Sequence, residues 1–186
     1  MPNVPHLKLL PTAPADDAVK PAMTLAQLYR EHSSYVAYIG IRILGRDDEI
    51  DDLVQDVFVD ACKGLRTVRD ADAVKGWLAT ITVRAATRRL RTRKFKRFLG
   101  LASLTHDVVW PGASPEECAA IARVYQRLES VSPRRRAAWV LRVVEQEPLA
   151  YVANVCGCSL ATAKRWIHET GMVVTGEAQR SDDDEP

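Results

Sequence analysis

One long segment with a single sign of charge constrains this chain more than any other feature. Residues 74–98 begin with apolar residues at helical spacing, and after Ala85 neither glycine nor proline occurs before Gly100. A helix of this length extends for roughly 36 Å at 1.5 Å per residue. The apolar residues of its first part are Val74, Trp77, Leu78, Ile81 and Ala85. We therefore expect a long helix whose first half packs in a core and whose second half is polar.

The second half of this helix is basic throughout. Residues 84–97 hold eight basic residues and no acid, namely Arg84, Arg88, Arg89, Arg91, Arg93, Lys94, Lys96 and Arg97. Like charges four residues apart repel each other on a helix, and no acid relieves them here. Arginine also binds phosphate with two parallel hydrogen bonds. An anionic partner is the favoured interpretation, and an ordinary solvated helix face is the alternative.

Opposite charges are separated along the chain. The net charge of the 186 residues is only +2, but residues 47–60 hold seven acids and no base. Apolar residues of this acidic segment recur at helical spacing and include Leu53 and Val57, so we expect a helix. Its other face would carry Asp52, Gln55 and Asp56, with Phe58 near the edge. The asymmetry predicts two surfaces with different partners.

The sequence gives little support for catalysis or a bound cofactor. The four cysteines form neither a disulfide framework nor the paired spacing of a zinc site, and the four histidines are scattered. The acidic cluster is a possible metal site, but no histidine stands at ligand spacing beside it. No glycine-rich phosphate loop or nucleophile elbow occurs. We predict a protein that is not an enzyme and has no catalytic residue, metal or cofactor.

Proline content and apolar periodicity divide the chain into helical units. Residues 1–22 hold five of the ten prolines, which predicts a disordered tail. No signal-peptide pattern or long apolar run is present, so we expect a cytoplasmic protein with no membrane partner. The expected fold is all-α, with two small helical domains joined by a flexible linker. The boundaries are residues 23–99 for the first domain, 100–115 for the linker, 116–175 for the second domain and 176–186 for an acidic tail.

Two helix starts can be read in the second half. Ser114-Pro115-Glu116-Glu117 has the form of a capping box with proline at the first helical position. Ser132-Pro133 begins a further helix, whose first turn is Arg134-Arg135-Arg136. Three cations there oppose the helix dipole. An intramolecular acid such as Glu129 explains them, and a phosphate or a protein partner is the alternative.

A helix-turn-helix pattern follows in residues 148–170. Ala153 is a small residue where two helices would cross, and Gly157 is able to adopt the positive φ of the turn. Ser159 would then cap a second helix, which can present its first two turns to a major groove. The alternative is an ordinary helical hairpin. The outward residues of the second helix are Ala161, Thr162, Lys164, Arg165 and His168.

In this order, an acidic helix, a basic helix begun by tryptophan and a helix-turn-helix resemble a known family. The pattern is similar to the bacterial extracytoplasmic-function (ECF) sigma factors of RNA polymerase. Residues 52–58, with the sequence DLVQDVF, resemble the family's segment that docks on the polymerase. Trp77-Leu78, Ile81 and the basic run resemble the promoter-melting segment, and residues 149–168 resemble the segment that reads the upstream promoter element.

The resemblance implies the partners and the site residues. The partners would be core RNA polymerase, promoter DNA and an anti-sigma factor. The polymerase-binding residues would be Asp52, Gln55, Asp56 and Phe58. The DNA-binding residues would be Arg84, Arg88, Arg91 and Lys94 in the basic helix, and Ala161, Thr162, Lys164, Arg165 and His168 in the recognition helix.

This chain departs from the family pattern at several positions. Arg84 and Arg88 stand where the family usually has Asn and Asp, and Glu169 stands where a basic residue often occurs. These differences indicate a divergent member. Two other classes remain open, a helix-turn-helix regulator that acts without polymerase and a decoy that binds polymerase but lacks promoter activity.

Overall fold

A computed structural model describes residues 23–65, 73–101 and 113–177. Within these ranges the secondary structure is entirely helical, as expected from the sequence. The expected N-terminal tail, the loop at residues 66–72, most of the linker and most of the acidic tail lie outside the described residues. The helices are α1 (Leu25–Leu44), α2 (Ile50–Gly64), α3 (Val74–Phe98), α4 (Pro115–Leu128), α5 (Pro133–Trp139), the π-helical segment η2 (Val140–Val144), α6 (Leu149–Cys156) and α7 (Leu160–Thr175).

The first three helices pack on one another around fully buried aliphatic side chains. Thr24 and Gln27 form a capping box at the start of α1, which satisfies backbone N–H groups that would otherwise have no partner. The helix ends at Gly45, whose φ of 68° is left-handed. The largest buried side chains of this unit are Leu28, Ile43, Leu53 and Leu78.

Helices α4–α7 form a second group, and its starts agree with the local sequence signals. The capping box predicted for residues 114–117 is confirmed, since Ser114 accepts from the backbone N–H of Glu117 and the Glu117 carboxylate accepts from that of Ser114. Pro133 stands in the first turn of α5, as predicted. The fully buried large side chains that hold this group together are Leu128, Val140, Leu141, Val152 and Val155.

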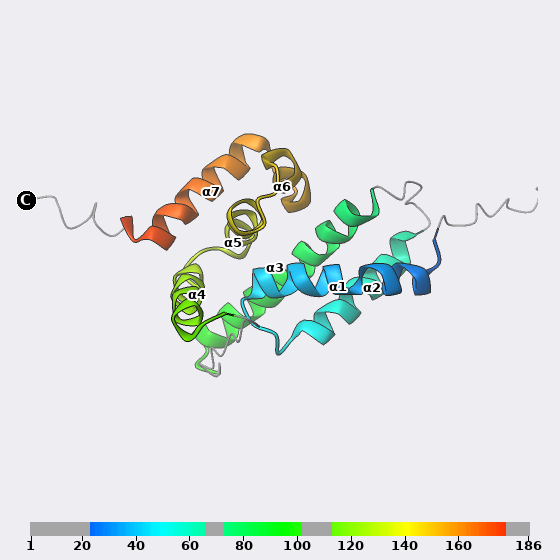
Figure 1. The fold of residues 1–186 in the computed structure, drawn as a ribbon, viewed down its shortest axis with the longest axis horizontal. Helices are drawn as coiled ribbons and strands as arrows, with labels where there is room; N and C mark the ends of the chain where they lie inside the picture. The colour runs from blue at the N-terminus through cyan, green and yellow to red at the C-terminus, as the bar shows by residue number, and fades with distance from the viewer. Residues whose placement is uncertain (1–22, 66–72, 102–112, 178–186) are drawn as a thin grey trace, which may run out of the picture.

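The two groups lie against each other, with α5 and α6 packed on α3 (Figure 1). One contiguous apolar core extends from Leu28 in α1 to Cys156 in α6. At this contact the hydroxyl oxygens of Tyr35 and Tyr151 lie 3.1 Å apart in a hydrogen bond. The proposed division into two domains remains a prediction, and in this conformation the two groups share a core.

The contact also covers the last turn of α1, where backbone carbonyls have no partner within the helix. Arg136 is 5% exposed and donates from Nε to the Ile43 carbonyl and from a terminal nitrogen to the Leu44 carbonyl, both at 2.8 Å. Tyr125 donates its hydroxyl to the Arg42 carbonyl at 2.7 Å. Cationic and O–H donors are therefore placed at the negative end of the α1 dipole. We call Tyr125 and Arg136, with these three carbonyls, the α1 latch.

Two of the three arginines in the first turn of α5 have intramolecular partners in the structure. Arg135 does pair with an intramolecular acid, but that acid is Glu169 in α7, at 2.9 Å. Arg136 instead binds backbone carbonyls of α1. Glu129, the acid considered from the sequence, contacts Arg97 of α3 at 2.7 Å.

Candidate nucleic-acid interface

All four predicted DNA-binding cations of α3 are exposed, and three of them have few contacts with the rest of the fold. Arg84, Arg88 and Arg91 are exposed, while Ala85, Ala86 and Leu90 between them are buried. This segregation follows from the helical period, since residues three and four apart share a face. α3 therefore presents a basic surface while its opposite side packs in the core.

Lys94, the fourth predicted cation of α3, has intramolecular partners. Its ammonium donates to the backbone carbonyls of Ser130 and Val131 at 3.2 and 2.9 Å. Burial lowers the pKa of Lys94, and the nearby positive charges of Arg97 and Arg136 lower it further. In this conformation the Lys94 ammonium joins α3 to the turn after α4, so a DNA contact would have to replace these two hydrogen bonds.

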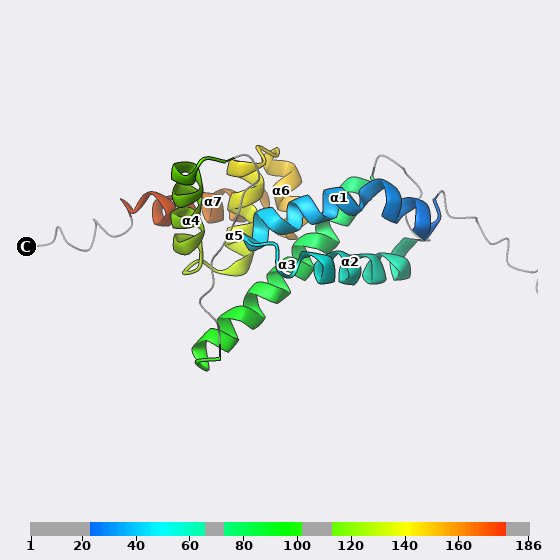
Figure 2. The same ribbon diagram turned by 60° about the horizontal axis from the view of Figure 1, so that its bottom comes forward.

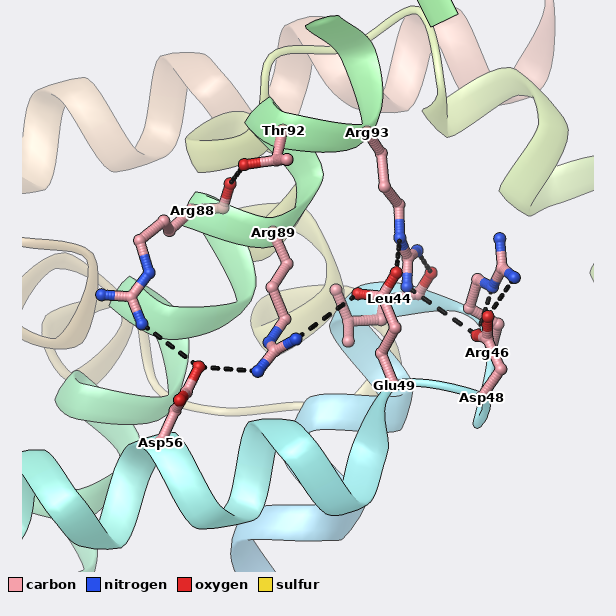
Figure 3. A network of polar contacts seen from close by, with 9 residues as sticks. All are labelled: Leu44, Arg46, Asp48, Glu49, Asp56, Arg88, Arg89, Thr92 and Arg93. Carbon is pink, nitrogen blue, oxygen red and sulfur yellow. Dashed lines mark hydrogen bonds and ion pairs between the residues drawn. The ribbon is translucent and has the colours of Figure 1, made fainter. Parts of the chain in front are cut away.

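A network of ion pairs joins the basic face of α3 to the acidic face of α2 (Figure 3). An Asp56 oxygen lies 2.6 Å from a terminal nitrogen of Arg89 and 3.4 Å from one of Arg88. Glu49 accepts from Arg93 Nε at 3.0 Å. Asp56, predicted to contact a polymerase, therefore already has cationic partners, whereas Asp52 and Gln55 are exposed on the same helix.

Phe58 differs from its expected position. Its side chain is only 5% exposed and meets the ring of Tyr29 edge to face, with 4.8 Å between ring centroids. The expected position of Phe58 near the edge of the polar face is therefore wrong, while its contact with a polymerase stays a prediction. The exposed apolar side chains near this place are Tyr29 in α1 and Val59 in α2, at 51% and 54%. The periodicity already indicated this, because Phe58 is four residues after Val54 and three before Ala61, both buried.

Helices α6 and α7 meet through the tight turn that the sequence predicted. Gly157 adopts φ 63° and ψ 49°, and the backbone N–H of Cys158 donates to the carbonyl of Ala153 at 2.9 Å. Ser159 then accepts from the backbone N–H of Thr162 at 3.2 Å and caps α7. Ala163, in the first turn of α7, is fully buried.

The predicted contact residues of α7 lie on one accessible side. Ala161, Lys164, Arg165 and His168 are exposed, and Thr162 is partly buried. The Arg165 side chain is 65% exposed and lies 3.8 Å from Glu169 in a long i,i+4 ion pair. Such exposed pairs contribute little to stability, so Arg165 is able to exchange Glu169 for another partner.

A cavity of about 600 Å³ lies beside the last turns of α3, bounded by the C-terminal end of α1, the start of α2 and the α4–α5 turn. Eight basic and four acidic side chains line it, so its surface carries surplus positive charge. The basic members are Arg46, Arg88, Arg89, Arg93, Lys94, Lys96, Arg97 and Arg136. This surplus raises the local concentration of anions at the basic end of α3.

The helices and side chains of the described part of the chain bear on membrane crossing and on metal binding. None of its helices combines the length and the apolar character that a membrane crossing requires. Within the same ranges, no group of three or more His, Cys, Asp or Glu side chains is placed to hold a metal ion.

Burial raises the pKa of the Cys156 thiol to about 12, which keeps it protonated and unreactive at neutral pH.

Comparison with known proteins gives matches for both the sequence and the fold. Residues 28–96, which include α2 and most of α1 and α3, match the family model for sigma-70 region 2. The ECF RNA polymerase sigma factor SigE of Mycolicibacterium smegmatis is 26% identical over 160 residues, which cover 84% of this chain. The chain spans 61% of the length of that curated relative.

Several solved structures share the fold, and one of them is a sigma factor in a complex. It is the sigma factor RpoE from Bartonella quintana, crystallised in complex with the anti-sigma factor NepR. The TM-score is 0.60 at 20% sequence identity, over 83% of this chain and 96% of that one. At 83% of this chain the likeness extends beyond the residues matched by the family model.

Proposed function

We propose that this protein is a sigma factor. The premise is that residues 28–96 belong to the sigma-70 region 2 family and that the chain is a divergent relative of the ECF sigma factors. It would bind core RNA polymerase in the cytoplasm and direct promoter recognition and opening. The observation that carries the proposal is the exposed basic face of α3, which lies within the matched residues. An all-cationic helix face suits the phosphates of promoter DNA.

The two DNA-binding elements would have different tasks. Arg84, Arg88 and Arg91 would bind phosphates, which hold the DNA without reading its sequence. Helix α7 would enter a major groove with its first two turns, where Lys164 and Arg165 reach base edges or phosphates. Two elements on one chain also raise the overall affinity, because binding of the first increases the effective concentration of the second.

The acidic surface of α2 would bind the polymerase. Asp52 and Gln55 are available there, and Tyr29 and Val59 provide exposed apolar area beside them. Charges at the rim of an interface chiefly accelerate association, and buried aromatic groups supply more of the affinity. We assign Asp56 first to the network with α3, from which it would have to be released to reach a partner.

An anti-sigma factor is a proposed further partner. RpoE of Bartonella quintana was crystallised with one, and its structure is similar to 83% of this chain. A protein that binds both groups of helices would stabilise the packed arrangement described above. The two alternatives differ from the proposal in their partners. A regulator would act on DNA without polymerase, and a decoy would bind polymerase without promoter activity.

Transcription in vitro from genomic fragments with purified core polymerase tests the proposal. We expect specific transcripts that require both the chain and the core enzyme.

Asp52→Lys should slow association with core polymerase because it reverses a rim charge. Glu116→Lys is the matched control, since Glu116 is an exposed acid in the first turn of α4 and has the same relation to a helix dipole.

Each outcome of this experiment separates the classes. DNA binding without any core-dependent transcript would favour the regulator, and core binding without transcripts would favour the decoy. Equal association rates for Asp52→Lys and Glu116→Lys would remove the acidic face of α2 from the polymerase interface.

A second prediction concerns the recognition helix. If Arg165 pairs with a guanine, Arg165→Ala should weaken binding to the preferred upstream sequence by about 1–3 kcal/mol and relax the preference at one position. The measurement is affinity for a set of duplexes with single substitutions. A loss of the same size for every duplex would make Arg165 a phosphate contact.

A further inference from the structure

The cavity beside the last turns of α3 is walled by both groups of helices. Residues of α1, α2 and α3 line it together with the end of α4, the α4–α5 turn and the start of α5. Its volume of about 600 Å³ lies within the range of small-molecule sites, roughly 300–1,000 Å³. A molecule that fills this cavity would therefore touch both groups at once.

Positive charges crowd one part of the cavity wall, which contains Arg93, Lys94 and Arg97 of α3 and Arg136 of α5. Burial lowers the pKa of Lys94, and the positive charges of Arg97 and Arg136 lower it further. Burial also lowers the pKa of Arg136 to about 10, and Arg93 and Arg97 contribute in the same direction. The fold thus holds like charges close together, and an anion among them would relieve their repulsion.

The acids of the cavity neutralise only part of this charge. Four acidic side chains line the cavity against eight basic ones, and one of the acids, Glu129, pairs with Arg97 at 2.7 Å. Asp48 lies outside the lining and pairs with Arg46. When Asp48 is included, three positive charges remain in excess. Either solvent ions or a bound ligand must balance this excess.

Lys96 and Arg97 are the cations that a ligand from solvent would meet first. The last turns of α3, which include both residues, extend beyond α1 and α2 (Figure 2). Both side chains are exposed, and the Lys96 ammonium has no polar partner in the described part of the chain. The Arg97 side chain is 40% exposed, so its pair with Glu129 contributes little and can be exchanged for another partner.

Charge and size together select the class of ligand. A single small anion would balance only part of the excess charge. A short chain of phosphates carries several negative charges in a volume well below that of the cavity. The guanidinium fork matches phosphate oxygens with two hydrogen bonds, and lysine binds phosphate as a point charge. The wall therefore has both kinds of phosphate-binding side chain.

Duplex DNA is the other polyanion to consider, and its shape argues against it here. Of the three cations proposed above for promoter phosphates, which are Arg84, Arg88 and Arg91, only Arg88 lines the cavity. A duplex is a stiff rod. It can lie across the opening of a cavity of about 600 Å³ but is unable to gather its phosphates inside.

We propose that this cavity binds a small molecule that carries a chain of phosphates, with Lys96 and Arg97 as its first contacts and Lys94 and Arg136 as fixed positive charges behind them. Inorganic polyphosphate and nucleoside triphosphates share this chemistry. Because both groups of helices wall the cavity, the bound anion holds them in the packed arrangement. The inference goes beyond the proposed function, since neither promoter nor polymerase supplies this ligand.

Isothermal titration calorimetry of the full chain with inorganic tripolyphosphate, at constant ionic strength, tests the proposal. We expect saturable binding of one anion per chain. Lys96→Ala should lower the affinity by about 10-fold, as for the loss of a hydrogen bond to a charged group. The fold should stay intact, because Lys96 has no polar partner to lose. Arg91→Ala is the matched control, an exposed cation of the same helix outside the cavity lining, and it should bind like the parent.

Urea denaturation tests whether the anion stabilises the packed chain. Saturating tripolyphosphate should raise the denaturation midpoint of the parent, because a ligand that binds only the folded state stabilises it. Sulfate at the same ionic strength should raise the midpoint less. The rise caused by tripolyphosphate should shrink in Lys96→Ala and persist in Arg91→Ala.

ATP in place of tripolyphosphate identifies the source of the phosphates. Tighter binding of ATP assigns the site to nucleotides, and equal or weaker binding assigns it to the phosphate chain alone. Absence of saturable binding for both anions would overturn the proposal. Equal losses of affinity in Lys96→Ala and Arg91→Ala would also overturn it, since binding would then reflect a general attraction to the basic helix. Because no promoter or polymerase is present, neither failure bears on core-dependent transcription.

Discussion

Replacing Arg136 by alanine should lower the free energy of unfolding by about 3 kcal/mol, since each buried carbonyl left without a donor costs roughly 1–3 kcal/mol. The guanidinium supplies the Ile43 and Leu44 carbonyls with donors and lies 5.3 Å from the centre of the Tyr125 ring. Burial lowers the pKa of Arg136 to about 10, so the group still carries its charge at neutral pH. Urea denaturation followed by circular dichroism measures the effect.

Arg135→Ala is the matched control for this prediction. Arg135 stands one residue earlier in the same turn and pairs with Glu169, but its side chain is 42% exposed. Its loss should cost less than about 1 kcal/mol, as for other exposed ion pairs. Arg136→Lys should recover part of the loss at most, because an ammonium lacks the planar fork that reaches two carbonyls. Equal destabilisation by the two alanine variants would mean that the α1 latch contributes nothing particular to the contact between the helix groups.

The helices and their ends were predictable because their signals are local. The capping box of Ser114 and Glu117 spans one turn, and the turn at Gly157 depends on the backbone freedom of a single residue. The all-cationic run of α3 likewise fixed which helix would present a basic face. Such features depend on neighbours within four residues, so their physical cause is already present in the sequence.

The ion pairs and the latch were not predictable because their partners are distant in the chain. Arg136 binds carbonyls 92 and 93 residues away, and backbone carbonyls leave no mark on the residue type that supplies them. Asp56 and Arg89 are 33 residues apart and meet only because α2 packs on α3. The charge pattern and the family resemblance therefore assigned Asp56 to an external partner only.

Phe58 illustrates a different kind of error. Its position on the apolar side of α2 could be read from Val54 and Ala61, yet the motif resemblance drew attention to it as a contact residue. A large aromatic side chain at the edge of an apolar stripe is readily covered by a neighbouring helix, and here Tyr29 of α1 covers it. Periodicity was the better guide to burial at this position.

Gly45→Ala should be the second strongly destabilising change, at about 3 kcal/mol from left-handed backbone strain plus overpacking. Gly45 ends α1 at φ 68°, and a Cβ atom there would stand 2.3 Å from Cδ1 of Tyr125. The Tyr125 hydroxyl is meanwhile held by the Arg42 carbonyl. The ring is therefore unable to move away without breaking the α1 latch.

Gly157→Ala separates the two causes of this effect. Gly157 has φ 63°, almost the same as Gly45, but a Cβ atom there would meet nothing within 4 Å. It should cost only the backbone strain, about 1 kcal/mol. In a double variant, Tyr125→Ala removes the ring that the new Cβ atom of Gly45→Ala would meet. The double variant should therefore lose less unfolding free energy than the sum of the losses in the two single variants. Denaturation midpoints of the three single variants and the double variant decide the matter. If Gly45→Ala and Gly157→Ala unfold at the same urea concentration, the glycine at the end of α1 serves only the helix end, and the close approach of Tyr125 does not depend on it.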